Sequence, residues 1–444
     1  ATAAPPPRAP SATSSASSSS RAAQSTAALC QDAVEAVAAS MGPPGQVATL
    51  ILPADVSWSE GGVPAPMPTL TVPPVADDAV VATIAKALQG GGKTALLLGA
   101  RALREPALMA AARIAAKTGV KLYAEVFPTR IERGAGLPHV ERIAYLAELA
   151  STQLAGLKHL VLVDAKSPVS FFAYPGKPSD LVPEGCTVHR LATYEQDAVA
   201  GLDKLVAALG AQDVQPELQT PQRPERPSGE LSAEKVCQAI GALLPERAII
   251  VDEAQTSGVK LPTFTRGAPR HDVITLTGGA IGQSLPNAVG AAIACPDRPV
   301  LTLVGDGSAM YTVQALWTMA REQLNVTTVV FNNKSYAILN MELQRVGATG
   351  KGDKARSQLD IGNPGLDFVQ LAQGMGVQAV RVTTAEEFNR ALEQALRTPG
   401  PFLIEAVVPN AYTGLKLKVL PHVLNALGSL PQPLAQAIKR KVAP

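Results

Sequence analysis

Short runs of valine and leucine alternate with helical patterns of roughly ten residues along most of this chain. Parallel strands need a crossover segment between them, and that crossover is usually a helix. The alternation therefore predicts an α/β fold with parallel sheets covered by helices on both faces. We expect two complete doubly wound parallel-sheet domains, one central and one C-terminal, and the remnant of a third. The predicted strands are residues 47–52 (a short buried strand), 95–98, 122–126, 160–163, 248–251, 300–304, 326–331, 377–382 and 402–407, and the predicted helices are residues 28–40, 79–89, 106–117, 233–244, 286–294, 312–322, 367–375 and 385–396.

Two proline-rich stretches, residues 64–74 and 216–227, divide the chain. A length of 444 residues also gives a prior of about three domains. The expected division is a low-complexity or transit-like segment at 1–28, a domain remnant at 29–60, a central α/β domain at 75–212, a linker at 213–230, a C-terminal α/β domain at 231–410 and an extension at 411–444.

The first 29 residues are almost wholly Ala, Pro, Ser and Thr, and the first acidic residue is Asp32. Such a segment buries too little apolar surface to offset the entropy of ordering it, which favours a disordered tail or linker. Its few arginines and many serines are also typical of an organelle transit peptide, which is the second interpretation. The chain starts with Ala1 instead of Met, which leaves open that residues precede it.

The composition excludes several classes of protein. Lys and Arg total 39 against 37 Asp and Glu, a net charge of +2, so no strong field favours nucleic acid or an anionic membrane as a partner. No apolar stretch reaches the roughly 18 residues that span a bilayer. The four cysteines are widely spaced without a C-x-x-C pair, and we expect buried thiols instead of disulfides or a zinc site. The expected location is soluble and intracellular: cytoplasmic, or a plastid or other organelle if the N-terminal segment is a transit peptide.

The chemistry is concentrated where the predicted strand 300–304 ends, at Gly305-Asp306-Gly307-Ser308. Glycine on both sides of an aspartate lets the backbone approach a phosphate closely, and a following helix N-terminus attracts the same anion. An aspartate repels phosphate unless a cation lies between them. Hard oxygen ligands of this kind select Mg²⁺.

A second half of the same site is expected one crossover later. Asn333 follows Asp306 by 27 positions, which is enough for one helix and one return strand. A right-handed crossover places both residues at the carboxyl ends of parallel strands in one sheet. The carboxamide oxygen of Asn333 is another hard ligand, so the spacing predicts a shared metal site.

These motifs, with residues 277–286 upstream and 334–339 downstream, resemble thiamine diphosphate enzymes. The branch they resemble holds acetolactate synthase and benzoylformate decarboxylase, and the resemblance covers about residues 30–410. It implies that Asp306, Asn333 and the backbone oxygen of Ser335 hold Mg²⁺. It further implies cofactor contacts from Gln255, Thr256, Gly279, Ile281, Gly307, Ser308 and Tyr336, with Gly279 receiving the aminopyrimidine and Ile281 bending the cofactor. For Tyr336, lining of the substrate cavity and core packing both stay open.

One departure from the family pattern concerns its first, pyrimidine-binding domain. That domain supplies the glutamate that activates the cofactor, and residues 29–60 resemble only its last part, so no catalytic residue is assigned. Glu253 lies beside Gln255 and Thr256 at a predicted strand end, and we expect it to order a loop. Gly99-Ala100-Arg101 lacks a full G-x-G-x-x-G fingerprint, so no flavin is indicated.

The sequence therefore predicts a protein that binds thiamine diphosphate and Mg²⁺. The implied reaction, of the lyase or transferase type, cleaves or forms a carbon–carbon bond at a 2-oxo acid. The expected partners are that substrate and either further copies of the chain or a partner chain that supplies the pyrimidine-binding domain. The alternative is a catalytically silent subunit or fragment that binds the cofactor. A plain dinucleotide-binding protein is disfavoured because the motif contains a metal-ligand pair.

Overall fold

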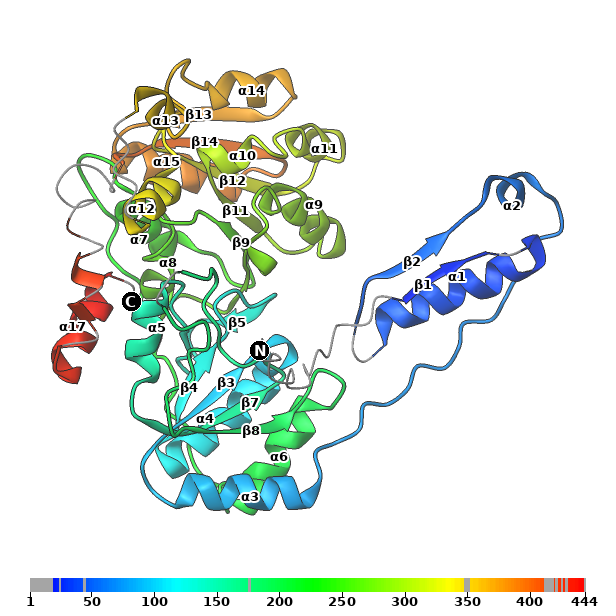
Figure 1. Cartoon of the computed structure of the whole chain (residues 1–444). Coiled ribbons are helices and arrows are strands. Elements are labelled where there is room, and N and C mark those ends of the chain that lie inside the picture. Colours follow the sequence, from blue (N-terminus) through cyan, green and yellow to red (C-terminus); the bar gives the residue numbers. More distant parts are fainter. Residues whose placement is uncertain are drawn as a thin grey trace, which may run out of the picture. The chain divides into compact units, whose positions relative to one another are not determined.

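The computed structural model describes residues 19–23, 25–42, 45–174, 177–346, 352–410, 419, 422–424, 426–427 and 430–442 (Figure 1). The chain divides into two compact units. The first comprises Ala1–Ala76 and Ala192–Asp197, and the second comprises Asp77–Leu191 and Ala198–Pro444. Each unit is described by itself below.

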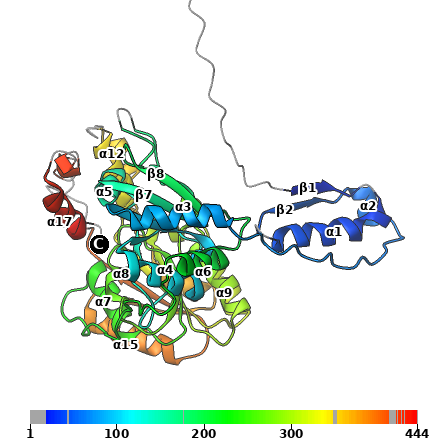
Figure 2. The same ribbon diagram turned by 90° about the horizontal axis from the view of Figure 1, so that it is seen from below.

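The first unit is one β-α-β element. Strands β1 (Ser19–Ala22) and β2 (Ala48–Ile51) pair in parallel, and α1 (Thr26–Met41) connects them and runs alongside them (Figure 2). The hydroxyl of Ser25 caps α1 by accepting a hydrogen bond from the backbone N–H of Ala28 at 3.2 Å. A short helix, α2 (Ala54–Trp58), follows, and residues 61–77 contain no helix or strand.

Two sequence predictions fail in this unit. Ser19–Ala22 lies in the segment predicted to be disordered but forms a strand, because its backbone finds a partner in β2, which composition alone does not reveal. Residues 1–18 of that segment are outside the described residues. The predicted strand at 47–52 exists, but it is not buried: its side chains alternate between half-buried and exposed, and Ile51 is 54% exposed. A two-stranded sheet with one helix cannot cover both of its faces.

The second unit contains two sheets. The smaller has five strands in the order β6-β4-β3-β7-β8, and its three pairings among β6, β4, β3 and β7 are parallel. Helices α3, α4 and α6 pack together along one face (Figure 1). On the other face, Ala95 and Leu97 of β3 share a buried cluster with residues of α5 and the C-terminal helix α17. The elements are α3 (Asp78–Gln89), β3 (Lys93–Leu98), η1 (Ala100–Leu103), α4 (Glu105–Thr118), β4 (Lys121–Ala124), β6 (Glu141–Arg142), α5 (Ala147–Leu154), β7 (Leu157–Val163), β8 (Thr187–Ala192), α6 (Ala198–Ala208) and α17 (Gln432–Val442).

The larger sheet has seven strands in the order β13-β14-β12-β11-β9-β10-β5. All neighbours pair in parallel except β10 and β5. One face packs on α9, α11 and α14, while α7 and α15 pack together and α15 contacts the last strands. Its elements are β5 (Ile131–Arg133), α7 (Ala233–Leu243), β9 (Ile249–Glu253), α8 (Leu261–Phe264), β10 (His271–Ile274), η2 (Thr277–Gly279), α9 (Ser284–Ala294), β11 (Val300–Gly305), α10 (Asp306–Ala309), α11 (Ala315–Arg321), β12 (Val326–Asn332), α12 (Ala337–Arg345), α13 (Asp353–Ser357), α14 (Phe368–Gly374), β13 (Gln378–Val382), α15 (Ala385–Arg397) and β14 (Phe402–Val407).

The α/β fold class with parallel sheets is confirmed, and β5 is its unexpected part. This strand lies within the range predicted for the central domain, yet it pairs antiparallel with β10 of the other sheet. Ile131 is buried and Arg133 lies opposite His271. Three residues, two of them charged, give no detectable strand periodicity, so the sequence does not predict this pairing.

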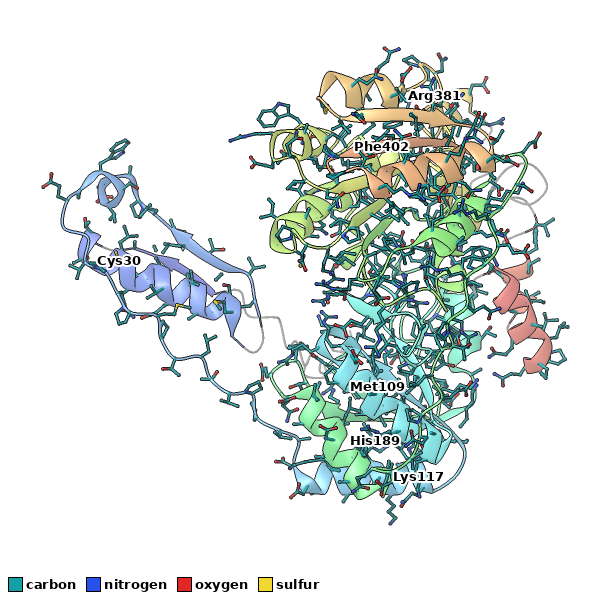
Figure 3. The ribbon with its side chains drawn as sticks, turned by 180° about the vertical axis from the view of Figure 1, so that it is seen from behind. Cys30, Met109, Lys117, His189, Arg381 and Phe402 are labelled. Carbon is teal, nitrogen blue, oxygen red and sulfur yellow. The ribbon has the colours of Figure 1, made fainter. Side chains whose placement is uncertain are left out.

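The four cysteines are free thiols. Cys237 is buried, whereas the other three, including Cys30 on α1 (Figure 3), are half-buried, so the expectation of buried thiols holds for Cys237 alone. Among the described residues, no helix has the length and apolar character needed to cross a bilayer.

Candidate functional site

The carboxylate of Asp306 joins the ends of two neighbouring strands. It follows β11 directly, is 3% exposed, and accepts hydrogen bonds from three backbone N–H groups. Its Oδ1 accepts from Gly307 at 2.8 Å, and its Oδ2 accepts from Asn333 at 3.0 Å and from Lys334 at 2.6 Å. Because β11 and β12 pair in parallel, the crossover spacing brings Asp306 and Asn333 together as expected.

Burial is the main influence on the ionisation of Asp306. Loss of water raises the pKa of its carboxyl to about 6, and the hydrogen bonds from the backbone offset part of this rise. A cation beside the carboxylate would favour its charged form further.

The loop after β12 presents further oxygen atoms. The side-chain oxygen of Asn333 accepts a hydrogen bond from the N–H of Ser335 at 3.0 Å. The hydroxyl of Ser335 donates to the carbonyl of Leu359 at 3.3 Å and accepts from the amide of Asn340 at 3.0 Å. Contacts on both sides of the loop therefore fix its backbone.

Tyr336 packs directly on the glycine-rich turn. A Cβ atom added to Gly307 would lie 2.3 Å from Cε1 of the Tyr336 ring. The Tyr336 ring is half-buried. Because it packs on Gly307, it contacts the candidate site. Any side chain at position 307 would push the ring away.

This donor set fits Mg²⁺. A carboxylate, a carboxamide oxygen and a backbone carbonyl are hard ligands, and here they come from the adjoining ends of β11 and β12. Within the described part of the chain, no group of three or more His, Cys, Asp and Glu residues could hold a metal. The carboxamide oxygen of Asn333 and the backbone carbonyl of Ser335 would therefore be needed to complete a metal site.

Glu253, at the end of β9, orders the loop before α9. Its carboxylate is 1% exposed and accepts hydrogen bonds from the N–H of Gly282 and, at 2.7 Å, of Ser284. Burial raises the pKa of Glu253, and these hydrogen bonds oppose the rise. The expected loop-ordering role is confirmed. Gln255 and Thr256, the candidate diphosphate contacts, follow it and are half-buried.

Gly279 lies under an aromatic ring that the sequence did not single out. Its backbone is left-handed, with φ of +71°, and an added Cβ would lie 2.2 Å from Cζ of Phe171. Phe171 also packs edge-on against Phe127, with centroids 5.5 Å apart. Ile281 is 42% exposed, two residues from Gly279. The sequence could have drawn attention to this ring, because Phe171 and Phe172 are adjacent aromatic residues in a chain that has only 4% aromatic residues.

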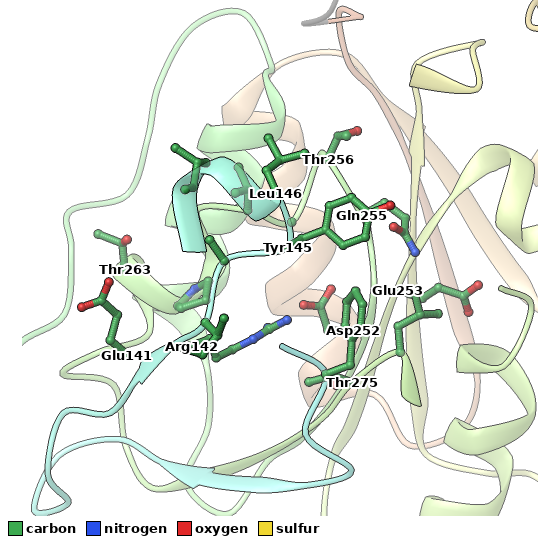
Figure 4. Close-up of a pocket in the computed structure, with 18 of the residues that line it drawn as sticks. Glu141, Arg142, Tyr145, Leu146, Asp252, Glu253, Gln255, Thr256, Thr263 and Thr275 are labelled. Carbon is green, nitrogen blue, oxygen red and sulfur yellow. The ribbon is translucent and has the colours of Figure 1, made fainter. Parts of the chain in front are cut away.

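A cavity of about 530 Å³ adjoins these residues, within the second unit (Figure 4). Residues 127–149 form one side, and residues 252–276 with Ile338 and Met341 form the other. Of the candidate site residues, Gln255 and Thr256 line it, while Asp306 and Asn333 do not. The sequence analysis missed its arginines, because residues far apart in the chain form it.

Comparison with known proteins identifies the class. Residues 256–406 match the family model of the "Thiamine pyrophosphate enzyme, C-terminal TPP binding domain". In addition, 85% of the chain aligns with a curated relative at 54% identity over 389 residues, which is 73% of that relative. The chain therefore belongs to the thiamine pyrophosphate enzymes.

That relative is the "Putative acetolactate synthase large subunit IlvX" of Mycobacterium tuberculosis. The chain is also 35% identical to the benzoylformate decarboxylase of Pseudomonas aeruginosa, over 40% of this chain and 32% of that protein. Within the family, it is thus a homologue of acetolactate synthase large subunits and of decarboxylases. Thiamine pyrophosphate is the cofactor of this family, with Mg²⁺ as the usual metal.

Solved structures agree with the fold. The thiamine diphosphate-dependent 4-hydroxybenzoylformate decarboxylase of Rhodococcus jostii RHA1 matches with a TM-score of 0.73 and 24% identity, covering 88% of this chain and 76% of that chain. The benzoylformate decarboxylase of Polynucleobacter necessarius gives a TM-score of 0.73 at 23% identity, covering 89% and 76%. At such identities, the likeness concerns the fold alone.

Proposed function

We propose that the ends of β11 and β12 hold the diphosphate and magnesium of thiamine diphosphate. Asp306, Asn333 and the carbonyl of Ser335 would ligate the metal. The observation that carries this proposal is the pair of hydrogen bonds from the 333–334 backbone to the buried Asp306 carboxylate. They hold the Asp306 carboxylate against the backbone of residues 333 and 334, in the loop that carries the other two proposed ligands.

The other candidate residues would surround the cofactor. Gln255, Thr256, Gly307 and Ser308 would contact the diphosphate. Gly279, Ile281 and Tyr336 would contact the rest of the molecule. Glycine at position 307 lets the Tyr336 ring pack directly on the backbone of this turn.

The proposed activity is cleavage or formation of a carbon–carbon bond at a 2-oxo acid. Bound thiamine diphosphate supplies the nucleophile and electron sink for this chemistry. The protein would bind and orient the cofactor, neutralise its charge and exclude water. Homo-oligomers, or a complex with a chain that carries a pyrimidine-binding domain, are part of this proposal, as is the assignment of residues 29–60 to that domain.

The alternative is a cofactor-binding protein without turnover of its own. Glu253, the acid beside Gln255 and Thr256, has its carboxylate engaged by the backbone of the 282–284 turn. It is therefore not free to exchange protons with a cofactor. Release of CO₂ from pyruvate or benzoylformate by the isolated chain separates the two functions: turnover well above that of free cofactor supports the enzyme.

Calorimetric titration with thiamine diphosphate in magnesium buffer tests the site itself. Asp306→Ala should weaken binding at least about tenfold, equivalent to roughly 1.4 kcal/mol. Asp203→Ala, which removes an exposed carboxylate from α6, is the matched control and should bind like wild type. Equal affinities of the Asp306 variant and wild type would disprove the assignment.

A further inference from the structure

Two histidines meet at the edge of the smaller sheet. His159 lies in β7 and His189 in β8, the last strand of that sheet (Figure 3). Nδ1 of His159 lies 3.1 Å from Nε2 of His189, and the ring centroids are 5.2 Å apart. Because the centroids lie further apart than these nitrogens, the rings point the two nitrogens at each other and do not stack. Both side chains are half-buried, so solvent reaches the pair.

The histidines face away from the cluster beside α5. Leu160, the next residue of β7, belongs to that buried cluster. Successive side chains of a strand point to opposite faces of the sheet, so His159 lies on the other face. Cys186, three positions before His189, also packs against the cluster beside α5, and its Sγ donates to the carbonyl of Thr187 at 3.9 Å. Its thiol is therefore not a third member of the pair.

The contact between the two rings has the chemistry of a metal ligand pair. A hydrogen bond between ring nitrogens needs one donor and one acceptor, so at least one of the two imidazoles is neutral. Neutral imidazole is also the form that binds metal ions. In a tetrahedral zinc site, two nitrogens at about 2.0–2.1 Å from the metal lie about 3.3–3.4 Å from each other. A metal ion in place of the shared proton would therefore require only a small movement of the rings.

The ligand type selects the kind of metal. Imidazole nitrogen suits Zn²⁺, Cu²⁺ and Ni²⁺, whereas Mg²⁺ prefers oxygen. The described residues contain no group of three or more His, Cys, Asp and Glu side chains that could hold a metal. Water would therefore fill the remaining positions, and we expect reversible binding instead of the closed coordination of a structural zinc site.

We propose that His159 and His189 bind a divalent transition-metal ion of the Zn²⁺ type through Nδ1 and Nε2. The ion ties the edge strand β8 to β7 and so stabilises the smaller sheet. This site is separate from the proposed magnesium site, whose ligands are oxygen atoms at the ends of two strands of the larger sheet. The proposal does not rest on the proposed function.

Calorimetric titration of the untagged, metal-free full chain with zinc chloride, without cofactor, tests the proposal. We expect one Zn²⁺ to bind per chain and an excess of Mg²⁺ not to displace it. His159→Gln and His189→Gln should each weaken Zn²⁺ binding at least about tenfold, since even a group that only orients a metal ligand is worth about 10–100-fold. His422→Gln, which replaces an exposed histidine outside the pair, is the matched control and should bind Zn²⁺ like wild type.

Two further variants separate this site from other places that Zn²⁺ would reach. Asp306→Ala should keep Zn²⁺ binding, and its loss there would assign the ion to the proposed cofactor site and overturn the proposal. Cys186→Ser should also keep it, and its loss there would assign the ion to the thiol. If the histidine variants fail to fold, wild type decides: Zn²⁺ but not Mg²⁺ should raise its midpoint of urea unfolding. A wild-type chain that binds no Zn²⁺ would leave the two rings as a hydrogen-bonded pair only.

Discussion

The contact between Gly307 and Tyr336 allows a test inside the glycine-rich motif itself. In Gly307→Ala, the new methyl group would lie 2.3 Å from Cε1, 2.8 Å from Cδ1 and 3.2 Å from Cζ of the ring. Ordinary contacts begin near 3.4 Å, so the ring must retreat by about 1 Å or more. Overpacking of this kind typically costs about 1–3 kcal/mol. Urea unfolding should show this loss, and calorimetry should show weaker thiamine diphosphate binding.

Gly305→Ala is the matched control two positions away. Its added methyl group would have Ser308 Oγ at 4.0 Å as its nearest neighbour, and the backbone φ of −73° suits alanine. We expect a change within about 0.5 kcal/mol. In a Tyr336→Ala background, Gly307→Ala should cost much less than in wild type, because the ring that it meets is gone. Equal losses in the Gly305 and Gly307 variants, or the same cost of Gly307→Ala with and without the ring, would refute this reasoning.

Three further predictions concern other parts of the chain. Burial raises the pKa of Glu125 from 4.5 to about 7, so wild-type stability is lost as pH rises between these values. In urea unfolding, Glu125→Gln should therefore be as stable as wild type near pH 4. At pH 8 it should be more stable than wild type, by at most about 3 kcal/mol. Arg345→Met should lower the unfolding free energy by about 1–3 kcal/mol, because it leaves two half-buried carboxylates, Glu148 and Glu342, without their guanidinium partner; an unchanged midpoint would contradict this. Gly279→Ala should weaken cofactor binding more than Gly278→Ala, since both have positive φ but only the first meets Phe171; equal calorimetric affinities would exclude the contact as the cause.

The sequence predicts those parts of the fold that depend on local pattern. The strand at 300–304 appears as β11, and the 27-residue separation of Asp306 and Asn333 corresponds to one crossover between parallel neighbours. The repeating apolar pattern is enough to predict the strand, and the fixed handedness of crossovers is enough to predict that Asp306 and Asn333 meet. The helix predicted at 312–322 is shorter, Ala315–Arg321, because residues 310–314 form turns after α10.

Contacts between distant segments could not be predicted in this way. Ser19–Ala22 is polar apart from its one alanine, and only its pairing with β2 makes it a strand. Phe171 meets Gly279 across more than one hundred positions of sequence, and Arg133 of the edge strand β5 reaches the carbonyl of Pro262 in α8. Such contacts carry no periodic signature. They are set by how the sheets come together.

The antiparallel pairing of β5 with β10 has a consequence for dissecting the chain. A fragment cut at the predicted boundaries, residues 231–410, would retain six strands of the larger sheet and lose the seventh. The backbone groups of His271, Asp272 and Val273 that now pair with Ile131–Arg133 would become an open edge. Open edges recruit strands from other molecules, which leads to aggregation or exchange of segments between copies. A soluble fragment would therefore need to retain residues 131–133, and the two sheets cannot be inherited or swapped as independent modules.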